Sequence, residues 1–389
     1  MRSVLEGTRP LFAAACLLTV AARWTTGDAD GQAGARLVFD TKFSEGLGFV
    51  TTVRPLSHGR VLVADPLGQT LLRVDLSSQK VDTLGRVGSG PREYRSPDAV
   101  FPLPGDSTLL VDLGNGRLTV IAANGRFVRS MPIARQTSDG RLTMILPRFV
   151  DSQGHLFFQT EDIGGGSAQD SAWIARFDVQ TGSIDTVAAV KLAGPARLRG
   201  RTGIMLGQAP LAPKDDWAVA PDGRVAVVRA DDYSVHWVRP GGETVNGPPT
   251  SYRPVPVGRA EKEAWVEEFF TGSIDMGIRR SANGERQVRF SRGSRDRGDL
   301  DIDQVIWPSH LPAFKPGRSV VAPNGDLWVQ RYGAVDQPVS IDVFDGRGQR
   351  KDEVALPARR HVVGFGSGVV YVIYVDEVGL HWLERYRIE

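Results

Sequence analysis

The side chains with the clearest capacity for chemistry are arginines and aspartates at the borders of short apolar runs. The arginines fall in or beside segments that join one group of runs to the next, and the aspartates close a run. The candidates are Arg92, Arg95, Arg148, Arg199, Arg201 and Arg360, together with Asp65, Asp112 and Asp231. Because a guanidinium fork matches the two oxygens of a carboxylate, sulfate or phosphate, these arginines could form an anion-recognising rim.

Each of these candidates also has a structural interpretation. Arginines in surface loops can be solvated charges without a ligand. An aspartate at the end of a strand can cap its own turn by accepting hydrogen bonds from backbone N–H groups. The sequence leaves both alternatives open.

Metal-binding patterns are weak. Asp299, Asp301 and Asp303 have the one-three-five spacing of a calcium loop, but Gln304 replaces the glycine of position six and His310 the glutamate of position twelve. The six histidines form no His-x-x-x-His or Glu-x-x-His pair. We therefore expect no cofactor, with calcium or another divalent ion as the alternative.

Signatures of nucleophilic catalysis and nucleotide binding are missing from the sequence. Gly364 to Gly368 reads G-F-G-S-G rather than G-x-S-x-G, so we expect Ser367 to be structural. There is no G-x-x-x-x-G-K motif, and no helical pattern follows the glycines at 164–166. The sequence therefore indicates neither an enzyme with a serine nucleophile nor a nucleotide-binding enzyme.

Composition narrows the class of protein and partner. The 389 residues are 41% hydrophobic and carry 47 basic against 45 acidic side chains, a formal net charge of +2. This near balance argues against a nucleic-acid partner. Cys16 is the one cysteine, so an intramolecular disulfide is excluded and stability must come from packing.

The amino terminus reads as a targeting segment. Residues 1–22 combine Arg2 and Arg9 with an apolar run from Leu11 to Ala22, which predicts a signal peptide. Residues 23–35 read as a flexible leader. We expect export to the periplasm or the extracellular space. The alternatives are a lipoprotein anchored through Cys16 and a signal segment that is not cleaved. The sequence indicates no other membrane span.

These candidate side chains must be positioned by a repeated unit. Six tight turns contain Gly59, Gly105, Gly154, Gly223, Gly325 and Gly368, and an apolar strand pattern surrounds each. The second repeat predicts four strands, which are Asp98 to Leu103, Ser107 to Asp112, Arg117 to Ala122 and Phe127 to Pro132. Because stacked four-stranded blades bury both faces of each sheet, the repeats predict an all-β, six-bladed β-propeller of antiparallel blades.

Two irregularities complete this prediction. The last repeat has three clear strands, so the surplus strand Arg36 to Lys42 is expected to complete it and close the ring. Residues 259–310, between the fourth and fifth repeats, combine a helical stretch from Glu261 to Phe270 with one hairpin. We interpret them as an insertion rather than a seventh blade, within a propeller domain of residues 36–389.

The segment from Gly85 to Gly125 resembles a known repeat. Gly88, Gly90, Pro91, Glu93, Tyr94 and Pro97, followed by Leu110-Val111-Asp112, Asn115, Arg117, Leu118 and Gly125, look like the NHL-type repeat of six-bladed β-propellers. The whole chain is also similar to exported bacterial six-bladed β-propeller proteins. The resemblance implies the fold; function is left open because such propellers include binding proteins and enzymes.

Antiparallel blades place the glycine turns on one face of the ring and the longer connecting loops on the other, so we expect a site on the loop face. The predicted function is a non-catalytic binding or scaffold module for a small molecule, glycan, peptide or envelope protein, and we expect a monomer. The alternative is a metal-dependent lactonase or lyase, in which a divalent ion polarises a carbonyl.

Overall fold

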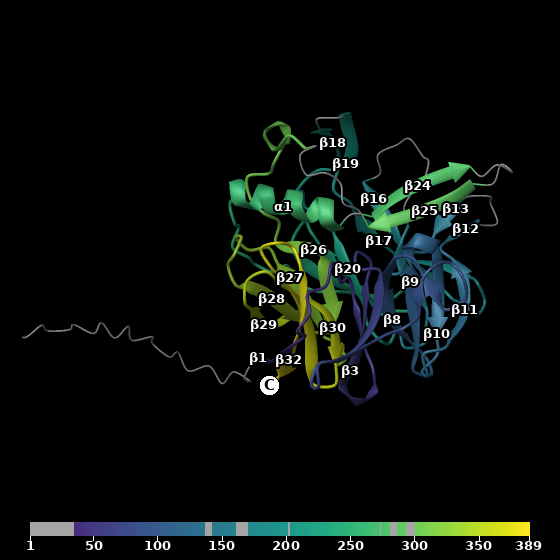
Figure 1. The fold of residues 1–389 in the computed structure, drawn as a ribbon. Helices are drawn as coiled ribbons and strands as arrows, with labels where there is room; N and C mark the ends of the chain where they lie inside the picture. Colours follow the sequence, from purple (N-terminus) through teal and green to yellow (C-terminus); the bar gives the residue numbers. More distant parts are fainter. Residues whose placement is uncertain are drawn as a thin grey trace, which may run out of the picture. The chain divides into compact units, whose positions relative to one another are not determined.

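The computed structural model describes residues 35–136, 142–160, 170–200, 203–272, 274–280, 286–292 and 300–389. Within these ranges, six four-stranded antiparallel sheets are arranged as the blades of a ring (Figure 1). Each blade is a meander because its strands are neighbours in both sequence and sheet, except where the last blade takes a strand from the start of the chain.

The strands of the first three blades are as follows. Blade 1 contains β2 (Val53–Pro55), β3 (Arg60–Asp65), β4 (Thr70–Asp75) and β5 (Lys80–Thr83). Blade 2 contains β8 (Pro97–Leu103), β9 (Ser107–Asp112), β10 (Arg117–Ile121) and β11 (Phe127–Pro132). Blade 3 contains β14 (Phe149–Val150), β15 (Leu156–Gln159), β16 (Ser171–Phe177) and β17 (Ile184–Lys191).

The other three blades follow the same order. Blade 4 contains β20 (Asp216–Val219), β21 (Val225–Arg229), β22 (Ser234–Val238) and β23 (Thr244–Asn246). Blade 5 contains β26 (Phe314–Val321), β27 (Leu327–Arg331), β28 (Val339–Phe344) and β29 (Arg350–Leu356). Blade 6 contains β30 (Arg360–Gly366), β31 (Val369–Val375), β32 (His381–Ile388) and β1 (Leu37–Lys42), which pairs with β32 from Leu37↔Ile388 to Lys42↔Glu384.

The first strand of each blade lies at the centre of the ring. These inner strands, which are β2, β8, β14, β20, β26 and β30, contact one another in a closed cycle. In a ring of six blades with the same strand order, the inner strands run in the same direction, and each leads through a tight turn into the second strand of its blade. Their starts therefore meet around the axis at one face, called here the loop face, and their ends meet at the opposite turn face.

The six predicted glycine turns connect the inner strands to the second strands. Every one of these glycines has a positive φ, between +67° and +88°. A side chain with a Cβ atom is strained in this left-handed conformation, so glycine is the residue that makes the turn without cost. The repeated glycine that predicted the blades is thus explained by backbone geometry.

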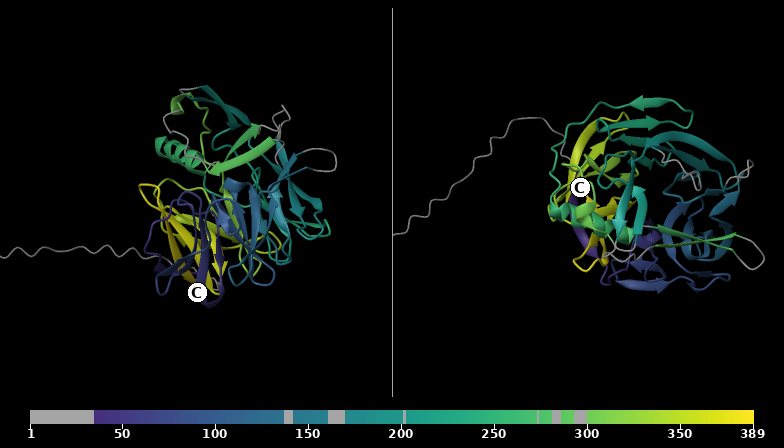
Figure 2. Two further views of the ribbon diagram at one scale, coloured as in Figure 1. Left: turned by 45° about the vertical axis from the view of Figure 1, so that its right-hand side comes forward. Right: turned by 90° about the horizontal axis from the view of Figure 1, so that it is seen from above.

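Smaller elements lie at the loop face. They are the sheets β6 (Arg86–Val87) with β7 (Glu93–Tyr94), β12 (Ala134–Gln136) with β13 (Leu142–Met144), and β18 (Pro195–Gly200) with β19 (Gly203–Gln208), and the insertion, which contains α1 (Arg259–Gly272), β24 (Ile274–Arg280) and β25 (Arg286–Arg292). In Figure 2, the view from above shows α1 and the β24–β25 hairpin lying across the near face of the ring. The connections between blades therefore contain small sheets of their own, of which β6–β7 is parallel and the others are antiparallel hairpins.

The core consists of apolar layers between successive blades. One layer joins blade 6 to blade 1 and contains Val63, Val74, Val363 and Ile373, all nearly inaccessible to solvent. Stacking blades in this way buries both faces of each sheet. The aromatic side chains of α1 form a separate cluster with Trp307 and Ala196.

The prediction of a ring of six four-stranded antiparallel blades is confirmed. The second repeat has its four strands within one residue of the expected bounds, and the insertion between blades 4 and 5 contains a helix and a two-stranded hairpin rather than a blade. In the described ranges, no helix combines the length and the apolar character needed to cross a membrane.

Candidate functional site

Charged side chains converge where the six inner strands begin. Five of the six blades contribute a charged or titratable side chain from the start of the inner strand or the residues just before it, and the insertion contributes two more. We call this set the axial cluster; it consists of Asp98, Arg148, Lys214, Asp216, Lys315, Arg318 and His361, with Glu268 from α1 and Arg292 from β25.

An irregularity in β26 presents two of the cations. The pairing of β26 with β27 jumps from Phe314 to Ser319, so the intervening residues leave the ladder. They include Pro316, which has no N–H to donate, and Gly317, whose φ is +86°. The sequence Lys-Pro-Gly-Arg therefore forms a bulge that displays Lys315 and Arg318.

Both of these cations contact one carboxylate of the insertion helix. Lys315 Nζ lies 2.7 Å from Glu268 Oε2, and Arg318 Nη2 donates to Glu268 Oε1 at 3.2 Å. The loss of solvation near the ring acts to raise the pKa of Glu268, although its side chain is still 43% exposed, and the charges of Lys315 and Arg318 outweigh this effect and lower the pKa to about 2. Glu268 is thus ionised at neutral pH and holds α1 over the axis.

A second group joins blades 3, 4 and 5. Arg148 Nη2 lies 2.7 Å from Asp216 Oδ1, while Asp216 Oδ2 accepts the backbone N–H of Ser319 at 3.0 Å. The guanidinium of Arg148 also lies over the ring of Trp217, 5.1 Å from its centroid. Burial and the charge of Arg148 lower the pKa of Lys214, which the charge of Asp216 opposes. Arg148 therefore pairs with the carboxylate of Asp216, whose charge also acts on Lys214.

The hairpin of the insertion is joined to blade 2 by a buried ion pair. Arg292 donates to both carboxylate oxygens of Asp98, at 2.5 and 2.9 Å, and the two side chains are only 8% and 6% exposed. The guanidinium also lies 4.6 Å from the ring centroid of Phe49. This bidentate pair fixes β25 against the start of β8.

Two neutral histidines lie beside these charges. Burial, followed by the charges of Arg318, His381 and Lys315, lowers the pKa of His361 well below its usual range. Burial and Arg318 likewise lower the pKa of His381 to about 4. His381 Nδ1 accepts the backbone N–H of Val50 at 3.0 Å, so its proton is on Nε2. The two ring centroids are 6.1 Å apart.

The axial cluster has a surplus of positive charge. Among the described residues it contains five cations, Arg148, Lys214, Arg292, Lys315 and Arg318, and three carboxylates, Asp98, Asp216 and Glu268. Because both histidines are neutral at pH 7, the formal charge of the cluster is +2. The arrangement favours an anion.

Of the nine residues predicted from sequence, Arg148 is the one that the described structure places in the axial cluster. Asp65 lies close enough to His381 to affect its pKa, but its oxygens accept hydrogen bonds from four backbone N–H groups. These belong to Gly48, Phe49, Leu67 and Gly68. Asp65 therefore ties the end of β3 to the segment that enters blade 1.

Asp112 has the equivalent position in blade 2. Its carboxylate accepts from the backbone N–H groups of Arg95 and Ser96 and from Asn115 Nδ2, and it lies 3.3 Å from Arg117 Nε. These contacts join the end of β9 to the segment that enters the blade. The backbone donors to Asp112 come from the preceding segment rather than from its own turn, so its contacts differ from the predicted turn capping.

The other candidates are dispersed. Arg360 forms a bidentate pair with Glu384, at 2.7 and 2.9 Å, and Asp231 pairs at the surface with Lys191. Exposed Arg95 donates from Nε to Ser89 Oγ. Arg92 is exposed with a φ of +63°. Arg201 and the side chain of Arg199 lie outside the described residues.

Among the residues that the structure describes, no ligand set is found for the predicted alternative of a metal site. Asp299 lies outside the described residues, and Asp301 accepts hydrogen bonds from Asp303 N and Gln304 Nε2. Within the described ranges, no three His, Cys, Asp or Glu side chains lie close enough together to hold a metal ion. The metal-dependent alternative remains a prediction, which elemental analysis and melting with and without EDTA would test.

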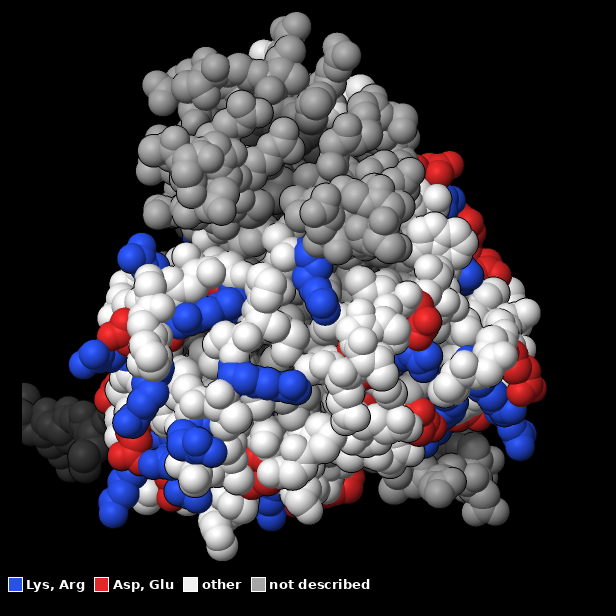
Figure 3. Space-filling view, turned by 90° about the vertical axis from the view of Figure 1, so that its right-hand side faces the viewer, with Lys and Arg blue, Asp and Glu red and all other residues white. Residues whose placement is uncertain are grey.

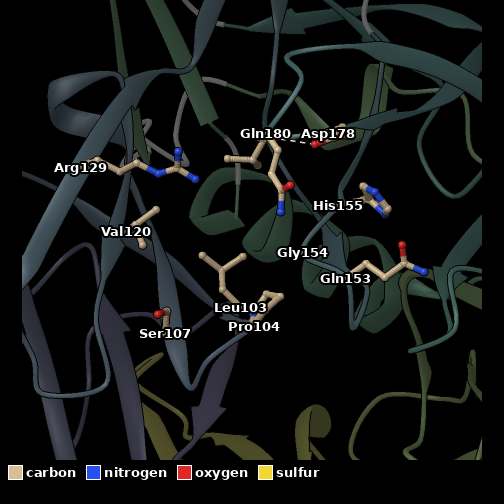
Figure 4. Close-up of a pocket in the computed structure, with 11 residues that line it drawn as sticks. Leu103, Pro104, Ser107, Val120, Arg129, Gln153, Gly154, His155, Asp178 and Gln180 are labelled. Carbon is tan, nitrogen blue, oxygen red and sulfur yellow. Dashed lines mark hydrogen bonds between the residues drawn. The ribbon is translucent and has the colours of Figure 1, made fainter.

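A cavity of about 540 Å³ lies at the turn face, between blades 2 and 3. Figure 4 shows Arg129, Gln180 and His155 around it, above the apolar side chains of Leu103 and Pro104. His155 Nδ1 is 2.7 Å from Asp151 Oδ2. Figure 3 shows basic and acidic side chains interspersed on the side of the molecule that lies at the right in Figure 1. The net positive cluster at the axis is distinct from this mixed surface.

Sequence reasoning missed most of the axial cluster. The sequence prediction rested on loop arginines, whereas most residues of the cluster lie at the starts of the inner strands. One usable signal was the Pro316-Gly317 pair inside an apolar strand, which indicates a bulge. Glu268 and Arg292 had no such signal, because only the folded chain brings the insertion over the axis.

The chain is similar in structure to other propellers. A member of the DUF4221 family from Bacteroides vulgatus matches with a TM-score of 0.51 at 11% identity, over 92% of this chain and 99% of that one. A gluconolactonase from Xanthomonas campestris matches with a TM-score of 0.43 at 12% identity, over 95% and 99%. Regucalcin from Agrobacterium tumefaciens, a calcium-binding protein, matches with a TM-score of 0.43 at 13% identity, over 90% and 95%.

At these low sequence identities, the similarity concerns the fold alone and says nothing about function. No family model matches the chain, and no curated protein matches its sequence. The resemblance to NHL-type repeats therefore stays a prediction, and any function must be argued from the site.

Proposed function

We propose that the protein is an exported binding module whose axial cluster holds a small acidic molecule. The main support for this proposal is the excess of cations over carboxylates where the inner strands begin. Export rests on the signal-like segment 1–22. The ring supplies a rigid frame, because each inner strand is fixed by its own blade and by its neighbours.

Arg318 is the best-placed anchor for a ligand. It donates to Glu268 through Nη2 and has no other hydrogen-bond acceptor among the described residues, so most of its N–H groups remain available. Its side chain is 26% exposed, as is that of Lys315. A ligand carboxylate bridging these two cations would gain charge-assisted hydrogen bonds and offset the surplus charge.

The test measures binding of succinate, malate and gluconate by isothermal titration calorimetry, with succinamide and sorbitol as uncharged counterparts. We expect the acids to bind and the uncharged compounds not to bind. Arg318→Gln should weaken acid binding at least about tenfold, because it removes the cation that faces the ligand.

The matched control is Arg176→Gln. Arg176 also pairs with one carboxylate, that of Asp185, but on the outer strands of blade 3. It should leave binding unchanged. Failure of all three acids to bind at millimolar concentration, or equal binding by the Arg318→Gln variant, would overturn the proposal.

A further inference from the structure

The cavity between blades 2 and 3 at the turn face has no part in the axial cluster. Its volume of about 540 Å³ lies in the range of pockets that hold small molecules. The turns of the two blades touch beside it, because a Cβ atom at Gly154 would lie only 3.0 Å from Pro104 Cδ. Leu103 and Val120 also line the cavity. One side of the cavity is therefore apolar and is closed by contact between the blades.

Polar side chains without partners form the other walls. Arg129 of β11 lies directly opposite Val120 of β10, so the two side chains share one face of blade 2. Among the described residues, neither the guanidinium of Arg129 nor the side-chain amide of Gln180 has a hydrogen-bond partner or an ion pair. Figure 4 shows both side chains reaching into the space between the blades. Their donors and acceptors are thus available to a ligand.

His155 adds a group whose orientation is fixed. Its Nδ1 lies 2.7 Å from Oδ2 of Asp151, whose side chain is only 3% exposed. Because a carboxylate accepts, the proton is on Nδ1, and Nε2 has no partner in the part of the chain that the structure describes. Asp151 Oδ1 also accepts the backbone N–H of His155 at 2.9 Å. The imidazole is therefore held at the cavity wall before any ligand binds.

The charges around the cavity are balanced. One cation and one carboxylate line it, Arg129 and Asp178, and the buried Asp151 lies behind the wall. Asp178 Oδ1 accepts the backbone N–H groups of Gln180 and Thr181, at 2.7 and 3.2 Å. An acid would meet these carboxylates and an amine would meet the arginine, so neither charge is favoured. A hydroxyl group both donates and accepts, and it can pair with every polar group of the walls.

We infer that this cavity binds a neutral saccharide. Its hydroxyl groups pair with Arg129, Gln180 and His155, and the C–H groups of its ring pack on Leu103 and Pro104. A sugar ring matches the cavity because it carries hydroxyl groups at its edge and C–H groups on its face. An open-chain polyol would lose more conformational freedom on binding. This second site lies beyond the proposed function and does not depend on it.

The experiment compares sugars that differ in charge or in ring closure. Calorimetry measures the binding of glucose, galactose and mannose, of sorbitol, and of the uronic acid and 2-amino sugar of each configuration. We expect at least one neutral sugar to bind at least about tenfold more tightly than sorbitol and than its own charged counterparts. The series is repeated with Arg318→Gln, which weakens acid binding at the axial cluster and should leave binding of the neutral sugar unchanged.

Arg129→Ala should weaken binding of the neutral sugar at least about tenfold, because it removes charge-assisted hydrogen bonds. Arg126→Ala is the matched control. Arg126 belongs to the same β10–β11 hairpin and is exposed like Arg129, but it does not line the cavity. Circular dichroism establishes that each variant is folded.

Four results would overturn the inference. They are no binding of any of the three neutral sugars at millimolar concentration, equal sugar binding by a folded Arg129→Ala variant, equal or tighter binding of a charged counterpart by Arg318→Gln, and loss of neutral-sugar binding in Arg318→Gln. The last result would place the sugar in the axial cluster. The proposed function is judged separately, by the binding of succinate, malate and gluconate.

Discussion

The two ends of the inner strands differ in how similar their residues are from one blade to the next. At the turn face, each strand ends in a turn whose glycine has positive φ, in all six blades. At the loop face, the starts carry different charged or titratable side chains, such as Asp98 in β8, Lys315 in β26 and His361 in β30. The turn is repeated because every blade needs it, whereas the residues at the start of the inner strand are free to vary from blade to blade.

The two ends are also stabilised differently. A turn glycine such as Gly105 has no atom within 4 Å of the position that a Cβ would take, so its role is conformational. Asp98 at the other end of the same strand is buried against Arg292. A substitution at the turn should therefore strain the backbone, whereas one at the loop end should leave a charge without its partner.

The largest effect is expected for Arg292→Leu. This change leaves Asp98 buried without its counter-ion, and breaking a buried pair costs roughly 3–5 kcal/mol. Chemical denaturation should show a fall of that size in the free energy of unfolding. The variant should also lose the connection between β25 and blade 2.

The control for this prediction is the double variant Asp98→Asn with Arg292→Gln, which removes both charges. It should recover part of the lost stability, because no unpaired charge remains buried. If Arg292→Leu changes the free energy of unfolding by less than about 1 kcal/mol, the pair is not the contact that distinguishes the loop end.

The next effect is a pH dependence of stability. His381 has a pKa of about 4 in the folded protein, against about 6.5 for an unperturbed histidine. Between these values the unfolded chain binds a proton that the folded chain does not, so stability falls as pH decreases from 6.5 to 4. The loss is about 1.4 kcal/mol per pH unit, or roughly 3 kcal/mol at pH 4.

His381→Asn isolates this contribution. Asparagine can still accept the N–H of Val50 through Oδ1, but it does not titrate. Denaturation of both proteins from pH 7.5 to pH 4 should give a smaller slope for the variant, although His361 keeps some dependence in both. Parallel curves for the two proteins would show that His381 does not bind a proton on unfolding.

The features that could be predicted from the sequence lie mainly at the turn face, and those that could not lie mainly at the loop face. The glycine turns and apolar runs predicted the six blades, and the strands of blade 2 fall within one residue of expectation. This was possible because a repeated backbone requirement leaves a repeated residue. The helix and hairpin of the insertion were also predicted, since helical and strand periodicities are local.

The site could not be predicted in the same way, because it joins residues distant in sequence. Arg292 and Asp98 are 194 positions apart, and no local pattern links them. Asp65 and Asp112 were recognised from the sequence, but in the structure they accept hydrogen bonds from the segments that enter their blades and do not belong to the axial cluster. A rule that follows the first residues of each inner strand would have selected Asp98, Asp216 and His361.

The smallest effect is expected for Gly105→Ala at the turn face. Because the φ of Gly105 is +71° and nothing lies near the added Cβ, the change should cost roughly 1–2 kcal/mol of unfolding free energy through backbone strain alone. Gly241→Ala is the matched control, since Gly241 is equally uncrowded but lies outside the left-handed region; it should be neutral or slightly stabilising. Neither variant should alter the affinity for malate, which calorimetry would measure. A tenfold loss of affinity in a folded Gly105→Ala variant would mean that the two ends of the inner strands are coupled, and acid binding would then depend on the turn face as well as on the axial cluster.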